Sequence, residues 1–214
     1  MQRKIRFGIP SKGRLKEPSL ALLDQAGINV IENSRSYIWA TTNPNFEVVL
    51  ARAFDVPIYV QYGAIDLGIT GQDIILERDA QVQQLLTLDF GQCSLVVAVP
   101  EASQISRVED IDGVARIATE YPNLSNKYFE ALGKQVEILE VRGSTELAPQ
   151  LGLGEIIVDI TSTGTTLRKN QLRIISKILG STCVLVCNKL AYRLFESEIQ
   201  KLLKRIRENG GTGN

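Results

Sequence analysis

Short apolar runs alternate with segments of helical periodicity along almost the whole chain. The runs that predict strands are residues 5–9, 37–42, 47–52, 66–70, 82–88, 93–100, 115–120, 136–141, 155–160, 173–179 and 183–189. The segments that predict helices are residues 17–27, 56–63, 70–78, 123–133, 144–154, 165–172 and 191–209. The last of these carries an apolar stripe made of Leu194, Ile199, Leu202, Leu203 and Ile206. Alternation of this kind predicts an α/β fold with largely parallel sheets.

Two of the apolar runs, residues 93–100 and 183–189, are uninterrupted, which is typical of buried strands. If the chain crosses into a second domain at the first run and returns at the second, the first domain is assembled from both ends of the sequence. We therefore predict a discontinuous domain I, residues 1–91 plus 183–214, and a domain II, residues 92–182. A cleft between two domains is a common ligand site, so we expect the ligand there.

The charge balance limits the partners of the chain. Lys and Arg number 24, as do Asp and Glu, so the 214 residues have a formal net charge of zero. A general nucleic-acid binder would be basic, so we expect no nucleic-acid partner. No stretch approaches the roughly 20 apolar residues of a membrane span, and the N-terminal segment lacks the apolar region of a signal peptide. We therefore expect no membrane association and a cytoplasmic location.

The chain contains no histidine. This absence excludes Ser-His-Asp and Cys-His nucleophilic machinery and zinc sites with histidine ligands. Cys93, Cys183 and Cys187 lie in apolar runs, so we expect them to be buried and reduced rather than redox-active or metal-binding. Any chemistry must then depend on carboxylates, basic side chains, hydroxyls, backbone dipoles or a metal held by oxygen.

Residues 157–166 read IVDITSTGTT, in which a predicted strand leads through a hydroxyl-rich loop into a predicted helix. A helix N-terminus stabilises a phosphate, and Gly164 allows the backbone to approach it closely. Asp159, at the end of the strand, is placed to accept hydrogen bonds from sugar hydroxyls. The alternative is a hydroxyl-rich N-cap turn, for which one or two hydroxyls would be sufficient. The remaining donors of the predicted phosphate loop are Thr161, Ser162, Thr163, Thr165 and Thr166.

Two other predicted strand-to-helix turns are candidates for ligand contacts. In the first, Lys12 and Arg14 flank Gly13, an arrangement that suits a polyphosphate, although such residues are often merely solvated. In the second, Gly71 precedes Asp73, which is either a helix cap or a polar ligand contact. Neither a Walker A motif nor a GxGxxG motif occurs.

Four segments together resemble the ATP phosphoribosyltransferase family, which carries out the first step of histidine biosynthesis. They read IPSKGRL, DVPIYVQYGAIDLGITGQD, ATEYPN and GSTELAPQLGLGEIIVDITSTGTTLRKNQL, and the likeness extends from about residue 5 to 190. Because the chain stops near residue 214, it resembles the short form of the family. Glu155, where Asp is common, and Phe54, where a small polar residue is common, depart from the family pattern.

The resemblance implies two α/β domains around a cleft, similar to the type II periplasmic binding proteins. It implies the substrates ATP and phosphoribosyl pyrophosphate, the products N1-(5-phosphoribosyl)-ATP and pyrophosphate, and Mg²⁺ bound with the pyrophosphate rather than at a metal site of the protein. The resemblance also implies that short forms act with a separate regulatory subunit similar to histidyl-tRNA synthetase in a hetero-oligomer. We therefore expect a homodimer or a hetero-oligomer, and histidine feedback that arrives through the second chain.

The resemblance also suggests roles for the candidate residues. The hydroxyl-rich loop and Asp159 are expected to hold phosphoribosyl pyrophosphate, while Lys12 and Arg14 stabilise the departing pyrophosphate as the catalytic residues. Arg35 and Arg52 are further candidates for substrate contacts, although surface positions or structural ion pairs explain them as well.

Two other functions compete with this one. A solute-binding protein of the same fold class would need a signal peptide and has no use for the hydroxyl-rich loop. A phosphoribosyltransferase that acts on a free base would share the Asp and Thr-Gly-x-Thr pattern of this loop, but the other three segments argue against it.

Overall fold

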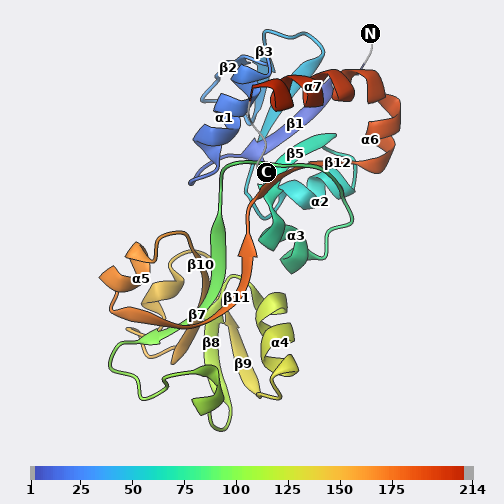
Figure 1. Cartoon of the computed structure of the whole chain (residues 1–214). Coiled ribbons are helices and arrows are strands. Elements are labelled where there is room, and N and C mark those ends of the chain that lie inside the picture. The colour runs from blue at the N-terminus through green and yellow to red at the C-terminus, as the bar shows by residue number, and fades with distance from the viewer. Residues whose placement is uncertain (1–2, 210–214) are drawn as a thin grey trace. The chain divides into compact units, whose positions relative to one another are not determined.

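The computed structural model describes residues 3–209. Within this range the chain divides into two compact units (Figure 1). Unit 1 contains residues 3–91 and 182–209, and unit 2 contains residues 92–181.

Thr182 belongs to unit 1, whereas the sequence analysis placed it at the end of the second domain. Its hydroxyl lies within hydrogen-bonding distance of the carbonyl oxygens of Leu88 and Phe90, at 3.2 Å from each. Its own carbonyl accepts a 3.0 Å hydrogen bond from Gln72 N–H. All three partners are residues of unit 1, so these contacts explain the position of the boundary.

In the described chain, seven strands of unit 1 form one sheet in the order β2-β3-β4-β1-β5-β12-β6. The neighbours β4, β1 and β5 are parallel, and the other pairs are antiparallel. The strands are β1 (Ile5–Pro10), β2 (Val30–Ile31), β3 (Ile38–Thr41), β4 (Phe46–Ala51), β5 (Leu67–Gly71), β6 (Gln83–Thr87) and β12 (Cys183–Cys187). The helices are α1 (Lys16–Gln25), α2 (Val56–Gln61), α3 (Gln72–Arg78), α6 (Lys189–Leu194) and α7 (Glu196–Glu208).

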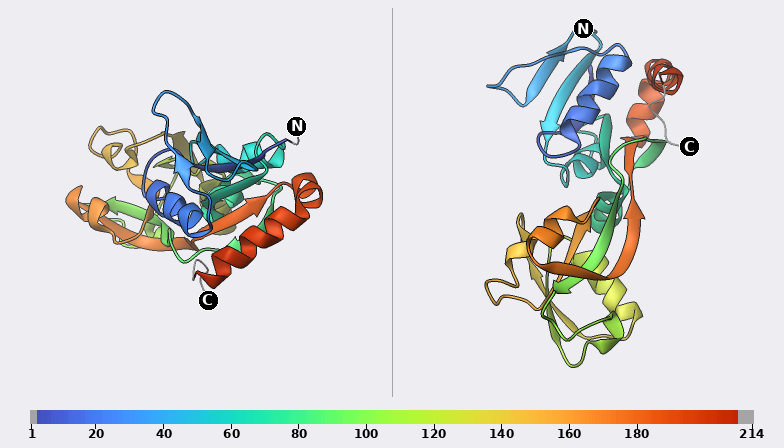
Figure 2. Two further views of the ribbon diagram at one scale, coloured as in Figure 1. Left: turned by 90° about the horizontal axis from the view of Figure 1, so that it is seen from above. Right: turned by 60° about the vertical axis from the view of Figure 1, so that its left-hand side comes forward.

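Helices cover both faces of this sheet because successive strand residues point to opposite sides. Leu185 packs with apolar residues of α1 and α7, whereas its neighbours Val184 and Val186 pack with Val56 and Val60 of α2. Figure 2 shows α1 and α7 side by side, and Arg205 of α7 donates a hydrogen bond to the Ala26 carbonyl that follows α1.

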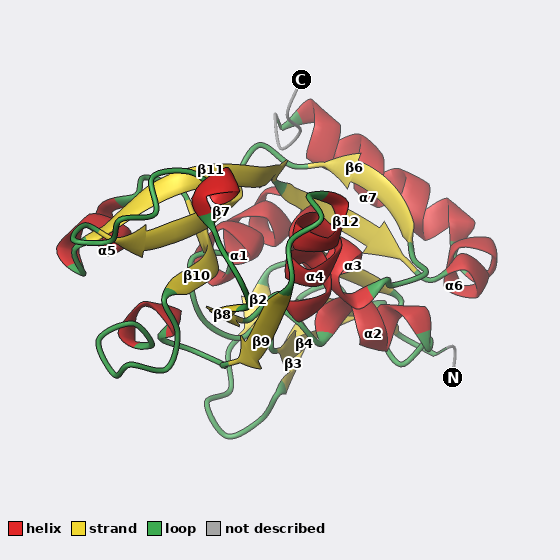
Figure 3. Ribbon diagram, turned by 90° about the horizontal axis from the view of Figure 1, so that it is seen from below, coloured by secondary structure: helices red, strands yellow, loops and turns green. Residues whose placement is uncertain are grey.

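In the described chain, five strands of unit 2 form a second sheet in the order β11-β7-β10-β8-β9. The neighbours β10, β8 and β9 are parallel, while β7 is antiparallel to both β10 and β11. Figure 3 shows β7 and β11 running side by side. The elements are β7 (Cys93–Pro100), the 3₁₀ turn η1 (Val108–Asp110), β8 (Ala115–Thr119), α4 (Pro122–Ala131), β9 (Val136–Glu140), the 3₁₀ turn η2 (Thr145–Leu147), β10 (Ile156–Thr161), α5 (Thr165–Lys169) and β11 (Leu172–Ser181).

The prediction of largely parallel sheets was wrong, because both sheets are mixed. Strands β3 and β4 are joined by a short turn at residues 42–45, and a connection of this length permits only antiparallel pairing. The strands next to the two crossings between the units, β7, β11 and β12, also pair antiparallel with neighbours in their own sheets. Strand β2 was not predicted, since it is only two residues long.

The prediction of a helix over residues 144–154 was also wrong. Only the three-residue turn η2 forms there. Pro149 has no N–H to continue a helix, and Gly152 adopts a φ of +70°, which is incompatible with one.

The predicted helix over residues 191–209 is two helices, α6 and α7, separated at Phe195. Helix α6 begins earlier than predicted because the Asn188 side chain caps it, accepting hydrogen bonds from the N–H groups of Leu190 and Ala191. Phe195 leaves helical geometry with its side chain buried in the core, and α7 then begins with Glu196 and Glu198 in its first turn.

Burial agrees with most of the remaining expectations. Ile199, Leu202, Leu203 and Ile206 are buried, but Leu194 is 69% exposed and does not belong to the stripe.

All three cysteines are free and buried, as predicted. Burial, with a smaller contribution from the negative charge of Asp66, raises the pKa of the Cys187 thiol to about 12, so the thiol stays protonated. Among the described residues, none of the helices combines the length and apolar character that a membrane span requires.

Candidate active site

The parallel strands of unit 1 end at one edge of their sheet. Pro10 at the end of β1 is in register with Ala51 at the end of β4, and Ser11 N–H donates a 2.7 Å hydrogen bond to the Ala51 carbonyl. Residues that follow these strands therefore gather at the carboxyl edge, where α/β sheets usually bind ligands. Lys12 and Arg14 follow β1 and Arg52 follows β4, so the structure brings these predicted residues to the same edge.

Arg35 reaches this edge from the opposite direction. It precedes β3, which is antiparallel to β4, and Leu50 N–H donates a 2.8 Å hydrogen bond to the Tyr37 carbonyl. The start of β3 is therefore next to the end of β4. We call Lys12, Arg14, Arg35 and Arg52 the basic edge of unit 1.

The side chains of the basic edge are exposed to solvent. Arg14 Nη1 donates a 2.7 Å hydrogen bond to the carbonyl of Gly91, at the end of the first segment of unit 1. Within the described residues, no carboxylate lies within ion-pair distance of the four cations, so a structural ion pair does not explain Arg35 or Arg52. The basic edge thus presents positive charge that the described chain does not neutralise in ion pairs.

Gly71 and Asp73 lie at the end of β5, at the same edge, but Asp73 points inward. Asp73 is only 2% exposed, and its carboxylate lies so close to Gly71 that a side chain at position 71 would collide with it. The structure places Gly71 at the N-cap of α3 and Asp73 in the first turn of this helix. Asp73 therefore reaches a ligand only if its side chain moves.

In unit 2, the hydroxyl loop, residues 161–166, connects β10 to α5 as predicted. Gly164 has a φ of +71°, and its N–H donates a 2.8 Å hydrogen bond to Thr161 Oγ1. The hydroxyls of Thr163 and Thr165 lie 2.9 Å apart and hydrogen-bond to each other. Some of the hydroxyls thus hold the loop in shape. The residues whose side chains face solvent are Ser162, Thr163, Thr165 and Thr166.

Helix α5 has five residues and ends at Lys169, although residues 165–172 were predicted to be helical. Gln171 adopts a φ of +56°, which ends the helical conformation. A helix of little more than one turn has a small dipole, so its N-terminus contributes less to phosphate binding than a long helix would. The N-cap residue is Gly164, which has no side chain with which to cap, so an ordinary hydroxyl N-cap does not account for the loop.

Asp159 is partly buried near the end of β10, beside two further carboxylates. Its pKa is raised to about 7, mainly by burial and in smaller part by the negative charges of Glu120 and Glu146. Hydrogen bonds from Ile160 N–H and from the Thr145 side chain lower this pKa. We call Glu120, Glu146 and Asp159 the acidic group.

The sequence analysis missed Glu120, Thr145 and Glu146. Glu120 follows β8, and Thr145 and Glu146 lie in η2, which follows β9. Strands β8, β9 and β10 are parallel to one another. Glu120 Oε1 accepts a 2.5 Å hydrogen bond from Gly143 N–H, which joins the two connections. Polar residues after parallel strands were the signal that would have revealed them.

No three His, Cys, Asp or Glu side chains of the described chain are arranged to hold a metal ion. A hollow of about 390 Å³ does exist in unit 2, but Pro100 and Leu172, which line it, lie near the start of β10 rather than its carboxyl end. No residue of the hydroxyl loop lines the hollow, although Lys169 and Asn170, which follow the loop, do.

The two units have the fold class of the type II periplasmic binding proteins. The alkanesulfonate-binding protein SsuA from Xanthomonas axonopodis pv. citri matches with a TM-score of 0.63 at 15% identity, over 97% of this chain and 73% of that one. The aliphatic sulphonate binding protein SsuA from Escherichia coli matches with a TM-score of 0.62, also at 15% identity, over 98% of this chain and 73% of that one. At this level of identity the likeness shows the fold alone.

The family model HisG, ATP phosphoribosyltransferase, matches residues 52–208. The ATP phosphoribosyltransferase of Methanocaldococcus jannaschii is 46% identical over 187 residues, which are 86% of this chain and 65% of that protein. The one of Methanothermobacter thermautotrophicus is 44% identical over 205 residues, 95% of this chain and 71% of that protein. This chain belongs to the ATP phosphoribosyltransferase family.

The chain is shorter than these curated relatives, since it spans 65% of the M. jannaschii protein. A solved chain of similar length also matches, in a structure described as the ATP phosphoribosyl transferase (HisG:HisZ) complex from Thermotoga maritima. The TM-score is 0.84 at 33% identity, and the match covers 96% of this chain and 98% of that one.

Proposed function

We propose that the chain transfers the 5-phosphoribosyl group of phosphoribosyl pyrophosphate to N1 of ATP, releasing pyrophosphate in the first step of histidine biosynthesis. The observation that carries this proposal is the family match over residues 52–208, which include Arg52, Gly71, Asp159 and the whole hydroxyl loop.

The proposed chemistry suits a chain without histidine. The lone pair of adenine N1 forms a bond to C1 of the ribose, and the bond from C1 to the pyrophosphate oxygen breaks with its electrons leaving on pyrophosphate. Adenine N1 is already a nucleophile, so no strong base is needed. Catalysis then consists of positioning the reactants and stabilising the negative charge of the leaving group.

The site residues take complementary roles in this proposal. The hydroxyl loop binds the 5-phosphate, and Asp159 accepts hydrogen bonds from the ribose hydroxyls. Lys12 and Arg14 stabilise the departing pyrophosphate, and Arg35, Arg52 and Gly71 make further substrate contacts. The cations of the basic edge are exposed and take part in no ion pair within the described chain. They support the role of Lys12 and Arg14 at the pyrophosphate, because a polyphosphate requires positive charge.

We also propose that Mg²⁺ enters with the pyrophosphate of the substrate. Side-chain clusters suited to hold a metal are absent from the described residues, which is compatible with an ion whose ligands are largely phosphate oxygens. The Mg²⁺ would neutralise part of the charge that develops on pyrophosphate.

The proposed partner is a regulatory subunit similar to histidyl-tRNA synthetase, with which the chain forms a hetero-oligomer. The support is the match to a chain from a HisG:HisZ complex over 96% of this chain. If feedback acts through this partner, histidine should inhibit the assembled complex and leave the lone chain unaffected. Calorimetry of the lone chain with histidine tests this, since tight and saturable binding would contradict it.

The activity is tested by mixing the chain with ATP, Mg²⁺ and phosphoribosyl pyrophosphate. We expect the absorbance of phosphoribosyl-ATP to increase and pyrophosphate to appear in equal amount. A parallel reaction with free adenine instead of ATP distinguishes the alternative enzyme class. Product formation with adenine but not with ATP would reject the proposal.

A further inference from the structure

The guanidinium group of Arg168 lies over the hydroxyl loop. Arg168 is in α5, but its side chain folds back toward the N-terminus of the helix. Its Nη2 donates a 3.1 Å hydrogen bond to the Thr163 carbonyl and lies 3.4 Å from Thr165 Oγ1. These contacts are on either side of Gly164, so one side chain connects both halves of the tight turn.

The conformation of Gly164 permits this contact. Its φ of +71° is readily adopted only by glycine. A Cβ at this position would lie 3.0 Å from Arg168 Nη1, which is closer than ordinary van der Waals contact. The glycine of the loop and the arginine four residues later therefore form one structural unit.

Arg168 also brings positive charge to the edge of the sheet that carries the acidic group. No carboxylate of the described chain lies within ion-pair distance of this side chain. The carboxyl edge of unit 2 carries the acidic group, which disfavours a bound phosphate, and the five-residue helix α5 has only a small dipole. A guanidinium has five N–H donors in a planar fork, so its two loop contacts leave donors available for an anion.

We propose that Arg168 is a positioning residue for the 5-phosphate of phosphoribosyl pyrophosphate, an inference that rests on the proposed function. It fixes the Thr163 carbonyl and the Thr165 hydroxyl, and its charge offsets that of the acidic group. In this proposal the contact binds the 5-phosphate equally strongly in the ground state and in the transition state. Losing this contribution raises KM and leaves kcat unchanged.

The test compares three variants of the full chain. Arg168→Gln removes the charge, Arg168→Lys keeps the charge but not the fork, and Lys169→Gln removes the adjacent exposed charge as a matched control. For Arg168→Gln we expect the KM for phosphoribosyl pyrophosphate to rise about tenfold or more, the size of one lost charge-assisted contact. We expect kcat to change less than about twofold, the KM for ATP to be unchanged, and Arg168→Lys to be intermediate.

Two inhibitors identify the phosphate concerned. Ribose 5-phosphate should inhibit Arg168→Gln more weakly than the wild type, by about the same factor as the change in KM. Inhibition by inorganic pyrophosphate should be unaltered. A general loss of the fold would weaken both inhibitors together and lower the thermal stability of the variant.

The outcomes separate the two proposals. A wild-type chain that forms no phosphoribosyl-ATP overturns the proposed function and the inference with it. An active wild type with equal KM values for Arg168→Gln and Lys169→Gln overturns the inference alone, as does a fall in kcat at constant KM. If Arg168→Gln does not fold, the comparison of Arg168→Lys with Lys169→Gln decides on the same criteria.

Discussion

The N–H of Gly164 donates a 2.8 Å hydrogen bond to Thr161 Oγ1, which closes the loop between β10 and α5. Gly164 is buried, so this N–H depends on the hydroxyl for its partner. The hydroxyls of the loop therefore have two functions. Thr161 supports the backbone, whereas the exposed hydroxyls face solvent, where a ligand can reach them.

Replacing Thr161 should show this supporting function. Thr161→Val leaves the Gly164 N–H without its partner and should lower the free energy of unfolding by about 1–3 kcal/mol. Thr161→Ser retains the oxygen and should lose less than about 1 kcal/mol. Urea denaturation measures both, and equal losses in the two variants would mean that the hydroxyl does not support the loop.

Replacing an exposed hydroxyl of the loop should affect one substrate only. Thr163→Val should weaken the binding of phosphoribosyl pyrophosphate, because a donor for the 5-phosphate and the hydrogen bond to Thr165 are lost, and it should leave ATP binding unchanged. Calorimetric titration with each substrate measures the two affinities. Unaltered affinity for phosphoribosyl pyrophosphate in a folded variant would reject the assignment of the loop.

Arg14 should act mainly on turnover. If its charge stabilises the departing pyrophosphate, Arg14→Ala should cost about 2–4 kcal/mol of transition-state stabilisation, similar to the loss of one oxyanion donor. The decrease should appear in kcat more than in either KM. Since Arg14 also donates a hydrogen bond to the Gly91 carbonyl, the free energy of unfolding of the variant should be measured as a control. A large KM effect at constant kcat would indicate ground-state binding instead.

The pKa of Asp159 should make stability depend on pH. Burial raises this pKa from 3.8 to about 7, so between these values the folded chain retains a proton that the unfolded chain has lost. The free energy of unfolding should therefore fall as pH rises from about 4 to 7, by at most about 1.4 kcal/mol per pH unit. Asp159→Asn cannot titrate and should gain stability relative to the wild type across this range. A difference between the two that stays constant with pH would contradict the prediction.

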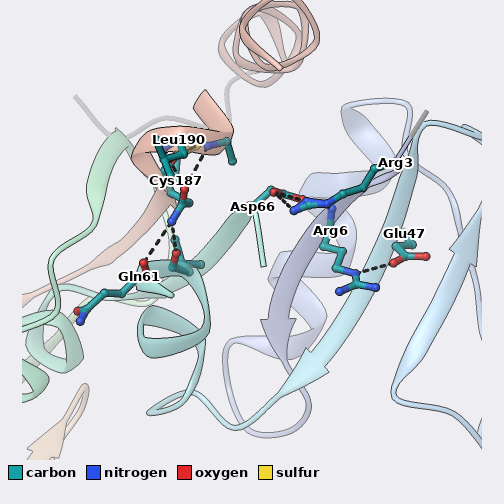
Figure 4. Close-up of polar contacts among 10 residues, drawn as sticks. Arg3, Arg6, Glu47, Gln61, Asp66, Cys187 and Leu190 are labelled. Atoms are coloured by element: carbon teal, nitrogen blue, oxygen red, sulfur yellow. Dashed lines mark hydrogen bonds and ion pairs between the residues drawn. The ribbon is translucent and has the colours of Figure 1, made fainter. Parts of the chain in front are cut away.

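The Asp66 carboxylate should contribute more to stability than a surface ion pair of unit 1. Asp66 is fully buried, and it accepts hydrogen bonds from Arg3 Nη2 at 2.7 Å and from Arg6 N–H at 2.8 Å (Figure 4). Asp66→Ala leaves the Arg6 N–H unpaired and should cost about 2 kcal/mol or more.

The matched control is the pair of Arg6 and Glu47, which is also drawn in Figure 4 and whose side chains are 44% and 20% exposed. Glu47→Gln should change the free energy of unfolding by less than about 1 kcal/mol. Urea denaturation of both variants measures the difference. Comparable losses in Asp66→Ala and Glu47→Gln would show that burial of Asp66 does not matter.

Local patterns along the chain were sufficient to predict most strands, the strand–loop–helix context of the hydroxyl loop and the residues that follow β1 and β4. These features depend on the spacing of apolar residues over a few positions, which a single sequence displays directly. The apolar stripe of α7 is an example, because Ile199, Leu202, Leu203 and Ile206 are all buried. Where local signals conflicted, as at Pro149 and Gly152, the predicted helix was wrong.

Only the tertiary structure determined how these segments combine. The pairing of β12 with β5, the break at Phe195 and the burial of Asp73 depend on contacts between residues far apart in the sequence. The acidic group is such a case, since Glu120 follows β8, Glu146 lies in η2 and Asp159 lies in β10. Convergence of this kind is set by packing and register over the whole unit, which no local pattern encodes.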